Sequence, residues 1–223
     1  MAAGNRCRGP GLLLIAIATL ALSACAKGPH GLPYDSWYIG ALAPPYMDVW
    51  IETVDVADAR GQVYKQVVSG VASMSSPPKL NVDPSGWART PGWGAGKHVL
   101  GAALPLWIYV RWQSLVEPET YEAFIRVDAT MRKAMVTGKK AFCEFDDKWI
   151  TDYPYAVNIG LAPGGIAKVW IAGQCTRSVP IARVQARVVE AGPYGGRYGN
   201  QYPDLNDVSK AYIEKYGVPY GSW

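Results

Sequence analysis

The sequence LWIYVRWQ, at residues 106–113, decides the fold class of this chain. Every second residue in it is a large apolar side chain, namely Leu106, Ile108, Val110 and Trp112. The residues between them form the opposite set, which is Trp107, Tyr109, Arg111 and Gln113. Because successive side chains of a β-strand point to opposite faces, this period of two predicts a strand with one face in a core and one in water.

Strand-like patterns recur on both sides of this stretch. We predict further strands at residues 37–43, 47–55, 61–74, 121–127, 142–145, 156–162, 166–172 and 181–189. The strand at 121–127 should bury Tyr121, Ala123, Ile125 and Val127, and the strand at 181–189 should keep Arg183, Gln185 and Arg187 in water. Pro163-Gly164-Gly165 separates two of these strands and predicts a hairpin turn.

Two short helices complete the prediction. One follows Asp128 as its N-cap, carries the apolar stripe Met131, Ala134 and Met135, and ends at Gly138. The other covers residues 206–216, with Val208, Ala211 and Tyr212 on one stripe and Gly217 and Pro219 after it. We therefore predict a mainly β fold, an antiparallel sandwich-like body that residues 35–223 form as a single domain.

An internal echo raises the question of duplication. Leu42-Ala43-Pro44 followed by Val49-Trp50-Ile51 recurs as Leu161-Ala162-Pro163 followed by Val169-Trp170-Ile171, and an Ile-Gly pair precedes each copy. Two hairpins of similar make, about 120 residues apart, would indicate two related β halves. Chance similarity between strand-rich segments explains the echo equally well.

The start of the chain is typical of an export signal. Arg6 and Arg8 precede an apolar run at residues 12–22, eleven residues interrupted only by Thr19. This run is too short to span a bilayer, which takes about 20 apolar residues. A basic start, a short apolar core and a small-residue exit predict a cleaved signal peptide at residues 1–24.

The exit of this signal, Leu22-Ser23-Ala24-Cys25, resembles the lipobox of bacterial lipoproteins. That resemblance implies that Cys25 is acylated and anchors the chain to a membrane. Ala26, in place of Asp, favours the outer membrane by the same resemblance, and residues 25–34 form a short Gly/Pro tether that holds the body on the periplasmic side. The alternative is an ordinary soluble export signal with an incidental cysteine.

Composition narrows the function classes. Removal of residues 1–24 leaves 199 residues, with 20 basic and 18 acidic side chains and a net charge of +2. This near-balance argues against a nucleic-acid partner. Nine Trp and fourteen Tyr are a heavy aromatic load, which favours strands and recognition surfaces.

Two cysteines, Cys143 and Cys175, remain beside Cys25 after processing. In an oxidising compartment their simplest interpretation is one disulfide bond. Two free buried thiols are the alternative, and no His lies near either cysteine in the sequence to suggest a metal site.

Motifs for catalysis are missing from the sequence. It contains no G-x-S-x-G, no H-E-x-x-H and no phosphate-binding glycine loop. Its two histidines are His30, in the tether, and His98, at the end of a long loop. We therefore predict a protein that is not an enzyme and has no catalytic residues, cofactor or metal, although carboxylate pairs brought together only by folding are invisible at this stage.

Binding is the function that remains, and two loops carry the residue types for it. The loop at residues 75–98 contributes the candidates Trp87, Arg89, Trp93 and His98, and the loop at 192–203 contributes Tyr194, Arg197, Tyr198 and Tyr202. Trp, Tyr and Arg dominate interface hot spots, so we predict that at least one loop contacts a partner. The alternative is that these rings fold back onto the β body.

Residues 31–223 also resemble a family of proteobacterial outer-membrane lipoproteins that form a domain of unknown function. The matching stretches are WYIGALAPPYMDVWIETVD (37–55), VRWQSLVEPETY (110–121), KAFCEFDDKWI (140–150), GLAPGGIAKVWI (160–171), GPYGG (192–196) and SKAYIEKYGVPYGSW (209–223). Some members look like immunity proteins of type VI secretion systems, paired with lipase or phospholipase effectors. The resemblance brings no catalytic residues with it.

The anchor, the missing motifs and this resemblance together predict an outer-membrane, periplasm-facing lipoprotein that neutralises a secreted lipase-type effector by covering its active site. Two rival functions stay open. One is an envelope structural or assembly lipoprotein, and the other is a glycan- or peptidoglycan-binding lipoprotein that uses exposed Trp rings.

Overall fold

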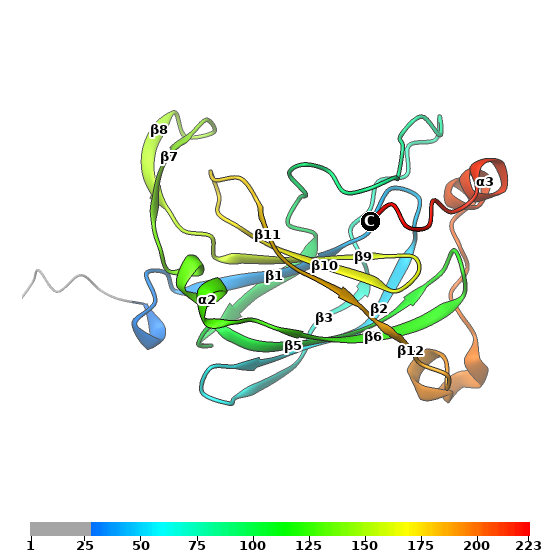
Figure 1. Cartoon of the computed structure of the whole chain (residues 1–223), viewed down its shortest axis with the longest axis horizontal. Coiled ribbons are helices and arrows are strands. Elements are labelled where there is room, and N and C mark those ends of the chain that lie inside the picture. The colour runs from blue at the N-terminus through cyan, green and yellow to red at the C-terminus, as the bar shows by residue number, and fades with distance from the viewer. Residues whose placement is uncertain (1–27) are drawn as a thin grey trace, which may run out of the picture.

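Two five-stranded sheets pack face to face in the computed structural model, which describes residues 28–223 (Figure 1). Sheet A has the strand order β11 (Val179–Gln185), β10 (Ile166–Ala172), β9 (Ala156–Ala162), β1 (Ser36–Leu42) and β4 (Ala95–Leu100). Sheet B has the order β12 (Arg187–Val188), β6 (Glu119–Arg126), β5 (Pro105–Ser114), β2 (Val49–Asp58) and β3 (Val63–Val71). The mainly β, sandwich-like fold is confirmed, while the predicted signal peptide and Cys25 lie outside the described residues.

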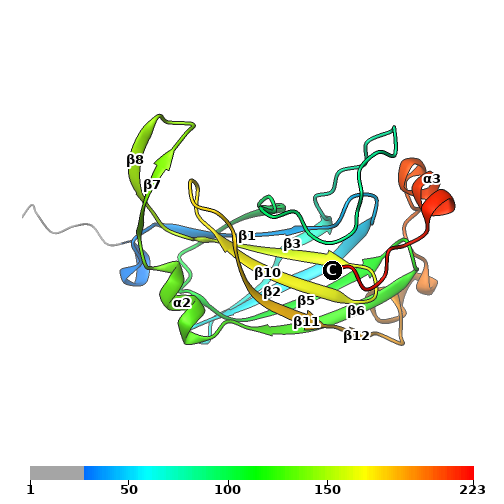
Figure 2. The same ribbon diagram turned by 45° about the horizontal axis from the view of Figure 1, so that its top comes forward.

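The smaller elements lie at the ends of this sandwich (Figure 2). A hairpin of β7 (Lys139–Cys143) and β8 (Lys148–Asp152) forms a third sheet. The two α-helices are α2 (Ala129–Met135) and α3 (Asp207–Tyr216), and the short 3₁₀ turns are η2 (Pro29–Gly31), η3 (Pro193–Gly195) and η4 (Arg197–Asn200).

Alternating side chains fill the space between the sheets, as the sequence pattern predicts. In β5 the side chains of Ile108, Val110 and Trp112 are fully buried. Opposite them lie apolar residues of sheet A, such as Ile159 and Leu161 of β9. Burial of this apolar surface is the main source of the fold's stability.

One strand pair departs from the antiparallel prediction. β1 pairs with β9 in parallel, with Ile39 opposite Val157. The reason lies in the path of the chain, because β1 leads through Pro44 and Pro45 into β2, which belongs to the other sheet. The first copy of the internal echo is therefore a crossing between sheets, whereas the second copy, β9 and β10, is the predicted hairpin.

The predicted strand at residues 181–189 is divided between the two sheets. Residues up to Gln185 pair with β10 in sheet A, and Arg187 and Val188 pair with β6 in sheet B. Between them Ala186 is buried and donates its backbone N–H to the carbonyl oxygen of Gly165, 2.8 Å away. This bend joins the sheets along one side of the sandwich.

Two strands were not predicted. β4 lies where the sequence suggests a loop, because its residues AGKHVL have one buried side chain, Val99, and no alternation. It fits against β1 only because it carries glycine, since a Cβ atom on Gly96 would lie 2.0 Å from the carbonyl oxygen of Ile39. β8 is largely exposed and likewise gives no periodic signal.

Both predicted helices are present, with small corrections. Asp128 caps α2 by accepting a hydrogen bond from the backbone N–H of Met131 at 2.8 Å, but the helix ends at Met135, three residues before Gly138. Asn206 caps α3, and Gly217 ends it. Ala211 is exposed rather than part of the buried stripe, since the helix buries Ser209 and Tyr212 instead.

A second, smaller core fixes α3 and the end of the chain to sheet A. Tyr212 of α3 stacks on Tyr46 with ring centroids 4.2 Å apart. Trp223 is buried in the same cluster and donates its indole N–H to the carbonyl oxygen of Pro84 at 2.8 Å. These contacts place the long loop and the last residues over the outer side of sheet A.

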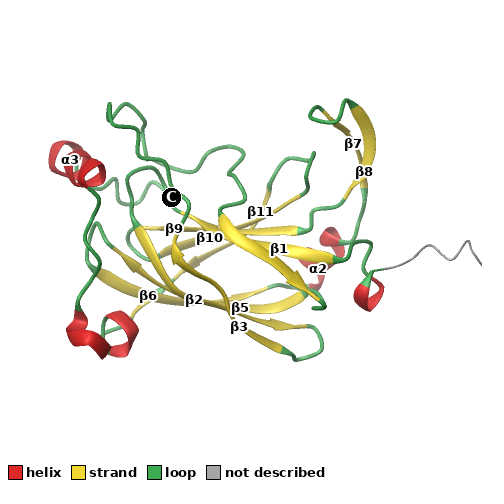
Figure 3. Ribbon diagram, turned by 180° about the vertical axis from the view of Figure 1, so that it is seen from behind, coloured by secondary structure: helices red, strands yellow, loops and turns green. Residues whose placement is uncertain are grey.

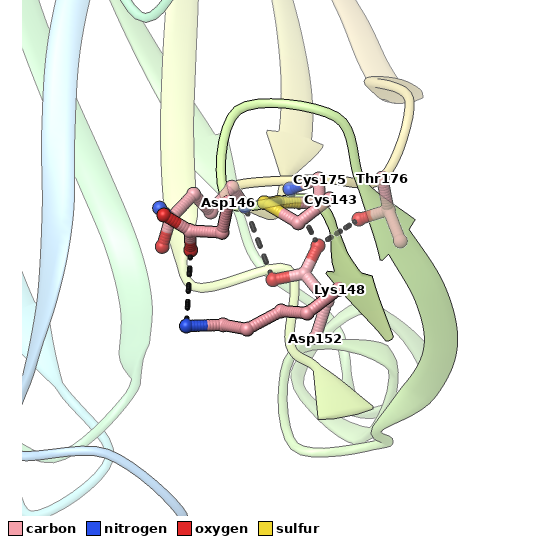
Figure 4. Close-up of a disulfide and its surroundings, with 7 residues drawn as sticks. Cys143, Asp146, Lys148, Asp152, Cys175 and Thr176 are labelled. Carbon is pink, nitrogen blue, oxygen red and sulfur yellow. Dashed lines mark hydrogen bonds and ion pairs between the residues drawn. A yellow bond between two sulfur atoms is a disulfide. The ribbon is translucent and has the colours of Figure 1, made fainter. Parts of the chain in front are cut away.

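Cys143 and Cys175 form the disulfide that the sequence suggests, and it joins the β7–β8 hairpin to the turn after β10 (Figure 4). Beside it, the buried carboxylate of Asp152 accepts hydrogen bonds from the backbone N–H groups of Gln174 and Cys175 and from the hydroxyl of Thr176, at 2.8–3.1 Å. The junction between the hairpin and this turn is therefore held by the disulfide bond and also by the hydrogen bonds to the Asp152 carboxylate.

Candidate functional site

The two outer faces of the sandwich differ in their cover. Sheet A is overlaid by the long loop, whose Trp87 packs edge-on against Trp170 of β10 at 5.2 Å and whose Trp93 packs against Tyr38 of β1 at 5.3 Å. Among residues 28–223, sheet B has only the turns η3 and η4 against one end of its outer face (Figures 1 and 3). In this part of the chain, the outer face of sheet B is therefore less covered than that of sheet A.

Aromatic rings line a depression in this open face, with a volume of about 390 Å³. Its wall is formed by Asp55, Val56, Ala57, Val63, Trp107, Tyr109, Glu122, Phe124 and Arg187. Trp107 is 42% exposed and Phe124 is 63% exposed, although both side chains are large and apolar. Exposed rings that cluster on one face are typical of a recognition surface.

The strand register brings these rings together. Tyr109 of β5 lies opposite Phe124 of β6, and their ring centroids are 4.8 Å apart. The next pair on the same face of the ladder is Trp107 and Arg126, and the guanidinium carbon of Arg126 lies 5.9 Å from the indole centroid. Cross-strand pairs of this kind hold each other's side chains in place.

Glu122 forms the polar wall of the depression. Its buried carboxylate accepts a hydrogen bond from the hydroxyl of Tyr109 at 2.6 Å and pairs with the guanidinium of Arg187. Burial, and then the neighbouring Glu122 carboxylate, raise the pKa of Tyr109 to about 12. The phenol therefore stays protonated at neutral pH and acts as a hydrogen-bond donor.

A second carboxylate, that of Glu52, ties the loop at residues 192–203 to the sheet. The β2–β5 register shifts between Ile51 and Thr53, so Glu52 sits in a bulge. Its buried carboxylate lies 2.8 Å from Nε of Arg111 and accepts hydrogen bonds from Gln113 at 3.0 Å and from the backbone N–H of Tyr194 at 2.7 Å.

The loop at residues 192–203 has strained backbone geometry. Tyr194, Tyr198 and Asn200 have φ angles of 52°, 61° and 59°, a left-handed conformation that side chains other than glycine seldom adopt. Arg111 donates to the carbonyl oxygen of Gly192 at 3.0 Å, and the indole N–H of Trp50 donates to the hydroxyl of Tyr194 at 2.6 Å. Such strain persists only where the surroundings enforce it, and it clusters at functional sites.

The four predicted contact residues on this loop lie at the end of the open face. Tyr198 is 79% exposed and packs edge-on against Tyr194, while Arg197 is exposed beside them. Tyr202 is half-buried, with its hydroxyl 3.2 Å from that of Thr120. The structure thus groups three of these side chains at the surface, and the fourth contacts β6.

The other four predicted residues lie on the opposite side of the molecule. Trp87 and Trp93 are half-buried against sheet A, and Arg89 is exposed between them in the loop. His98 is inside β4 rather than at the end of a loop, and its Nδ1 lies 2.9 Å from the hydroxyl of Ser36. The two loops therefore do not form one surface, and Trp87 and Trp93 fold back onto the strands.

Sequence reasoning missed the depression itself. It placed Trp107, Tyr109 and Arg111 on the water-facing side of a strand but drew no site from them. The signal was present, because two aromatic rings at positions i and i+2 on a water-facing strand are better explained by recognition than by solvation. Phe124 and Arg187 join them only through the fold, since they come from separate strands.

Within residues 28–223, no group of three or more His, Cys, Asp or Glu side chains is arranged to hold a metal ion.

In that same part of the chain, neither α-helix has the length and apolar character that crossing a bilayer would require.

The comparisons with known proteins place the chain in a family without adding a function. No match was found among curated proteins or among solved structures. A family model described as a protein of unknown function, DUF2931, matches residues 23–221, which is almost the whole chain after the predicted signal. The chain belongs to this family of unknown function, as the resemblance of its sequence stretches to such a family implied.

Proposed function

We propose that this protein is a lipid-anchored, periplasm-facing protein of the outer membrane that binds and neutralises a secreted lipase-type effector. The observation that carries the proposal is the open outer face of sheet B, where the exposed rings of Trp107 and Phe124 line a depression and Tyr198 is exposed on the loop at one end of the face. The resemblance to type VI immunity proteins supplies the class of partner.

Rigid presentation supports this use of the face. Trp107, Tyr109 and Phe124 sit on paired strands, and the Glu52 and Glu122 carboxylates tie down the polar groups around them. A surface that is already ordered loses little conformational entropy when it binds, so more of its contact energy appears as affinity. Aromatic rings with two side-chain torsions supply such contacts at low cost.

The proposed anchor adds to affinity by confinement. Cys25 lies three residues before Gly28, the first described residue. Three residues span at most about 10 Å, so an acylated Cys25 would keep Gly28, where the folded body begins, within about 10 Å of the lipid anchor. A phospholipid-hydrolysing toxin acts at the same bilayer. Tethering a binder there raises its effective concentration at the place where the toxin works.

Inhibition of this kind needs no chemistry from the binder. Covering the mouth of a lipase active site, or holding its lid, prevents lipid from entering. The charged rim of the depression, with Asp55, Glu122 and Arg187, would then set which effector fits.

The test is protection from killing. Each lipase-type effector encoded beside the gene is directed to the periplasm of a sensitive strain, with and without this protein. We expect survival only with it, loss of survival for the double variant Phe124→Asp/Tyr198→Ala, and full survival for the matched control Arg89→Ala on the opposite face. Equal killing in the presence and absence of the protein would refute the proposal.

A glycan-binding role is the second candidate, and one observation favours it. Trp107 and Phe124 lie beside the carboxylates of Asp55 and Glu122, and flat rings beside hydrogen-bond acceptors suit a sugar. Retention of the protein on purified peptidoglycan, lost in the Trp107→Ala variant, would support this role over effector binding.

A further inference from the structure

The hairpin β7–β8 exposes an apolar surface that the proposed toxin-binding face does not include. Phe142 and Trp149 lie directly opposite each other in the ladder, pack edge-on at 5.7 Å, and are 41% and 63% exposed. At the turn, Phe145 is 94% exposed. Three large apolar side chains therefore face water on one short element, which is costly unless something covers them.

The outward direction of this surface follows from the register. Cys143 and Asp152 share the other face of the hairpin and are buried against the turn at residues 173–176. Side chains on the opposite face, Phe142 and Trp149, must therefore point away from the molecule. Lys140 lies on the same outward face, with its ammonium 5.2 Å from the Trp149 ring.

The hairpin lies at the end of the molecule where the described chain begins (Figures 1 and 2). Tyr34 packs against Tyr153, just after β8, at 6.2 Å and against Tyr155 at 5.7 Å. The Tyr34 hydroxyl also donates to the carbonyl oxygen of Met135 in α2, at 3.3 Å. The base of the hairpin is therefore fixed to the segment that follows the proposed tether.

Charge around the exposed rings is balanced. Residues 139–148 contain the three bases Lys139, Lys140 and Lys148 and the three acids Glu144, Asp146 and Asp147, which gives a net charge of zero. Asp146 and Lys148 lie 3.5 Å apart as an ion pair. A neutral surface of Trp, Phe and Lys matches the interface of a bilayer with zwitterionic headgroups, where Trp rings gather and Lys side chains extend toward the polar layer.

We propose that the outward face of β7–β8, formed by Lys140, Phe142 and Trp149 with Phe145 at its tip, lies in the headgroup region of a zwitterionic phospholipid bilayer. The hairpin is then a second contact with the membrane beside the proposed acylated Cys25, and this inference rests on that part of the proposed function. The two contacts together orient the body on the bilayer, with the disulfide and Asp152 keeping the hairpin rigid.

The test uses the lipid-modified chain, recovered from envelopes and reconstituted into phosphatidylcholine vesicles whose acyl chains carry bromine on the carbons next to the headgroup region, where an interfacial ring can reach it. Bromine quenches tryptophan emission on contact. Trp149 is one of nine tryptophans, so contact should quench about one ninth of the emission. The quenched component should vanish in Trp149→Phe and persist in the matched control Trp107→Phe, which changes an exposed ring of sheet B.

The remaining outcomes separate this inference from the proposed function. Addition of anionic phosphatidylglycerol should leave the quenching unchanged, because the surface is neutral, and quenching that needs the anionic lipid would overturn the proposal. Quenching that persists in Trp149→Phe would also overturn it, as would Trp149 emission that responds to an effector protein and not to brominated lipid. A chain that does not stay with the vesicles would overturn both the anchor and the hairpin contact, whereas the protection assay tests effector binding separately.

Discussion

Removal of the Cys143–Cys175 disulfide is the perturbation whose size the structure predicts most directly. The two cysteines are 32 positions apart. The chain-entropy relation gives the conformational entropy that the unfolded chain loses when a loop of that length is closed. This loss raises the free energy of the unfolded state by about 3.7 kcal/mol at 25 °C. We expect the double variant Cys143→Ala/Cys175→Ala to lose about this much free energy of unfolding.

The structure also predicts that this loss of stability arises in the unfolded state and not in the folded one. Asp152 still accepts hydrogen bonds from Gln174, Cys175 and Thr176 when the sulfurs are gone, because none of these bonds uses a cysteine side chain. The native junction should therefore survive, and the cost should come from the greater freedom of the unfolded chain.

The assay is equilibrium unfolding in guanidinium chloride, combined with amide hydrogen exchange of the hairpin. Wild type and the double Ala variant are compared under non-reducing conditions, and Asp152→Asn in the double-variant background serves as the probe of the second clamp. A loss below about 1 kcal/mol would refute the chain-entropy account for this loop. Fast exchange throughout β7–β8 in the double variant, with Asp152 intact, would show that the carboxylate does not hold the junction.

Three other perturbations follow from buried groups. Trp112→Ala should cost about 3–5 kcal/mol, measured by denaturant unfolding, because it empties a fully buried site between the sheets; a loss under about 1 kcal/mol would mean that the core collapses to fill it. Glu52→Gln should cost about 1–3 kcal/mol and speed tryptic cleavage after Arg197, because Arg111 and the backbone N–H of Tyr194 lose their charged partner; an unchanged cleavage rate would show that the carboxylate does not fasten the loop. Burial of Asp58 favours its neutral form, but hydrogen bonds from Arg60 and from backbone N–H groups outweigh this and hold its pKa below the ordinary value. The stabilisation from the Asp58 carboxylate is therefore complete above the unfolded-state pKa of about 3.9 and is lost as the pH falls from there through the lower pKa of the folded state. In Asp58→Asn the free energy of unfolding should fall less steeply at acid pH than in wild type. An unchanged slope would contradict the role given to Asp58.

The sandwich could be predicted from sequence because one-sided burial leaves a local pattern. β5 and β6 alternate so regularly that the inward side chains of both were identified. β4 carries no such pattern, since its place depends on glycines that let it approach β1. The parallel pairing of β1 with β9 is also invisible, because nothing within either strand specifies a partner so distant in sequence.

The candidate site was only partly predictable for a related reason. Composition drew attention to the Tyr-rich loop at residues 192–203, and the structure places that loop on the open face of sheet B. The depression needs Trp107, Phe124 and Arg187 from three strands, so it exists only once those strands are in register. The exposed pair Phe142 and Trp149 depends in the same way on a hairpin of which only one strand gave a signal.

The parallel pair has a consequence for how the protein is made. Ile39 pairs with Val157, a separation of 157 − 39 = 118 residues. Closing so long a loop is slow, and during synthesis β1 leaves the ribosome well before β9 has been made. Until then the side chains of Trp37 and Ile39, which are fully buried in the folded protein, are exposed to solvent and can associate with other chains. Premature release of the chain would thus yield fragments prone to aggregate, and these two side chains mark the segment that a chaperone would have to shield.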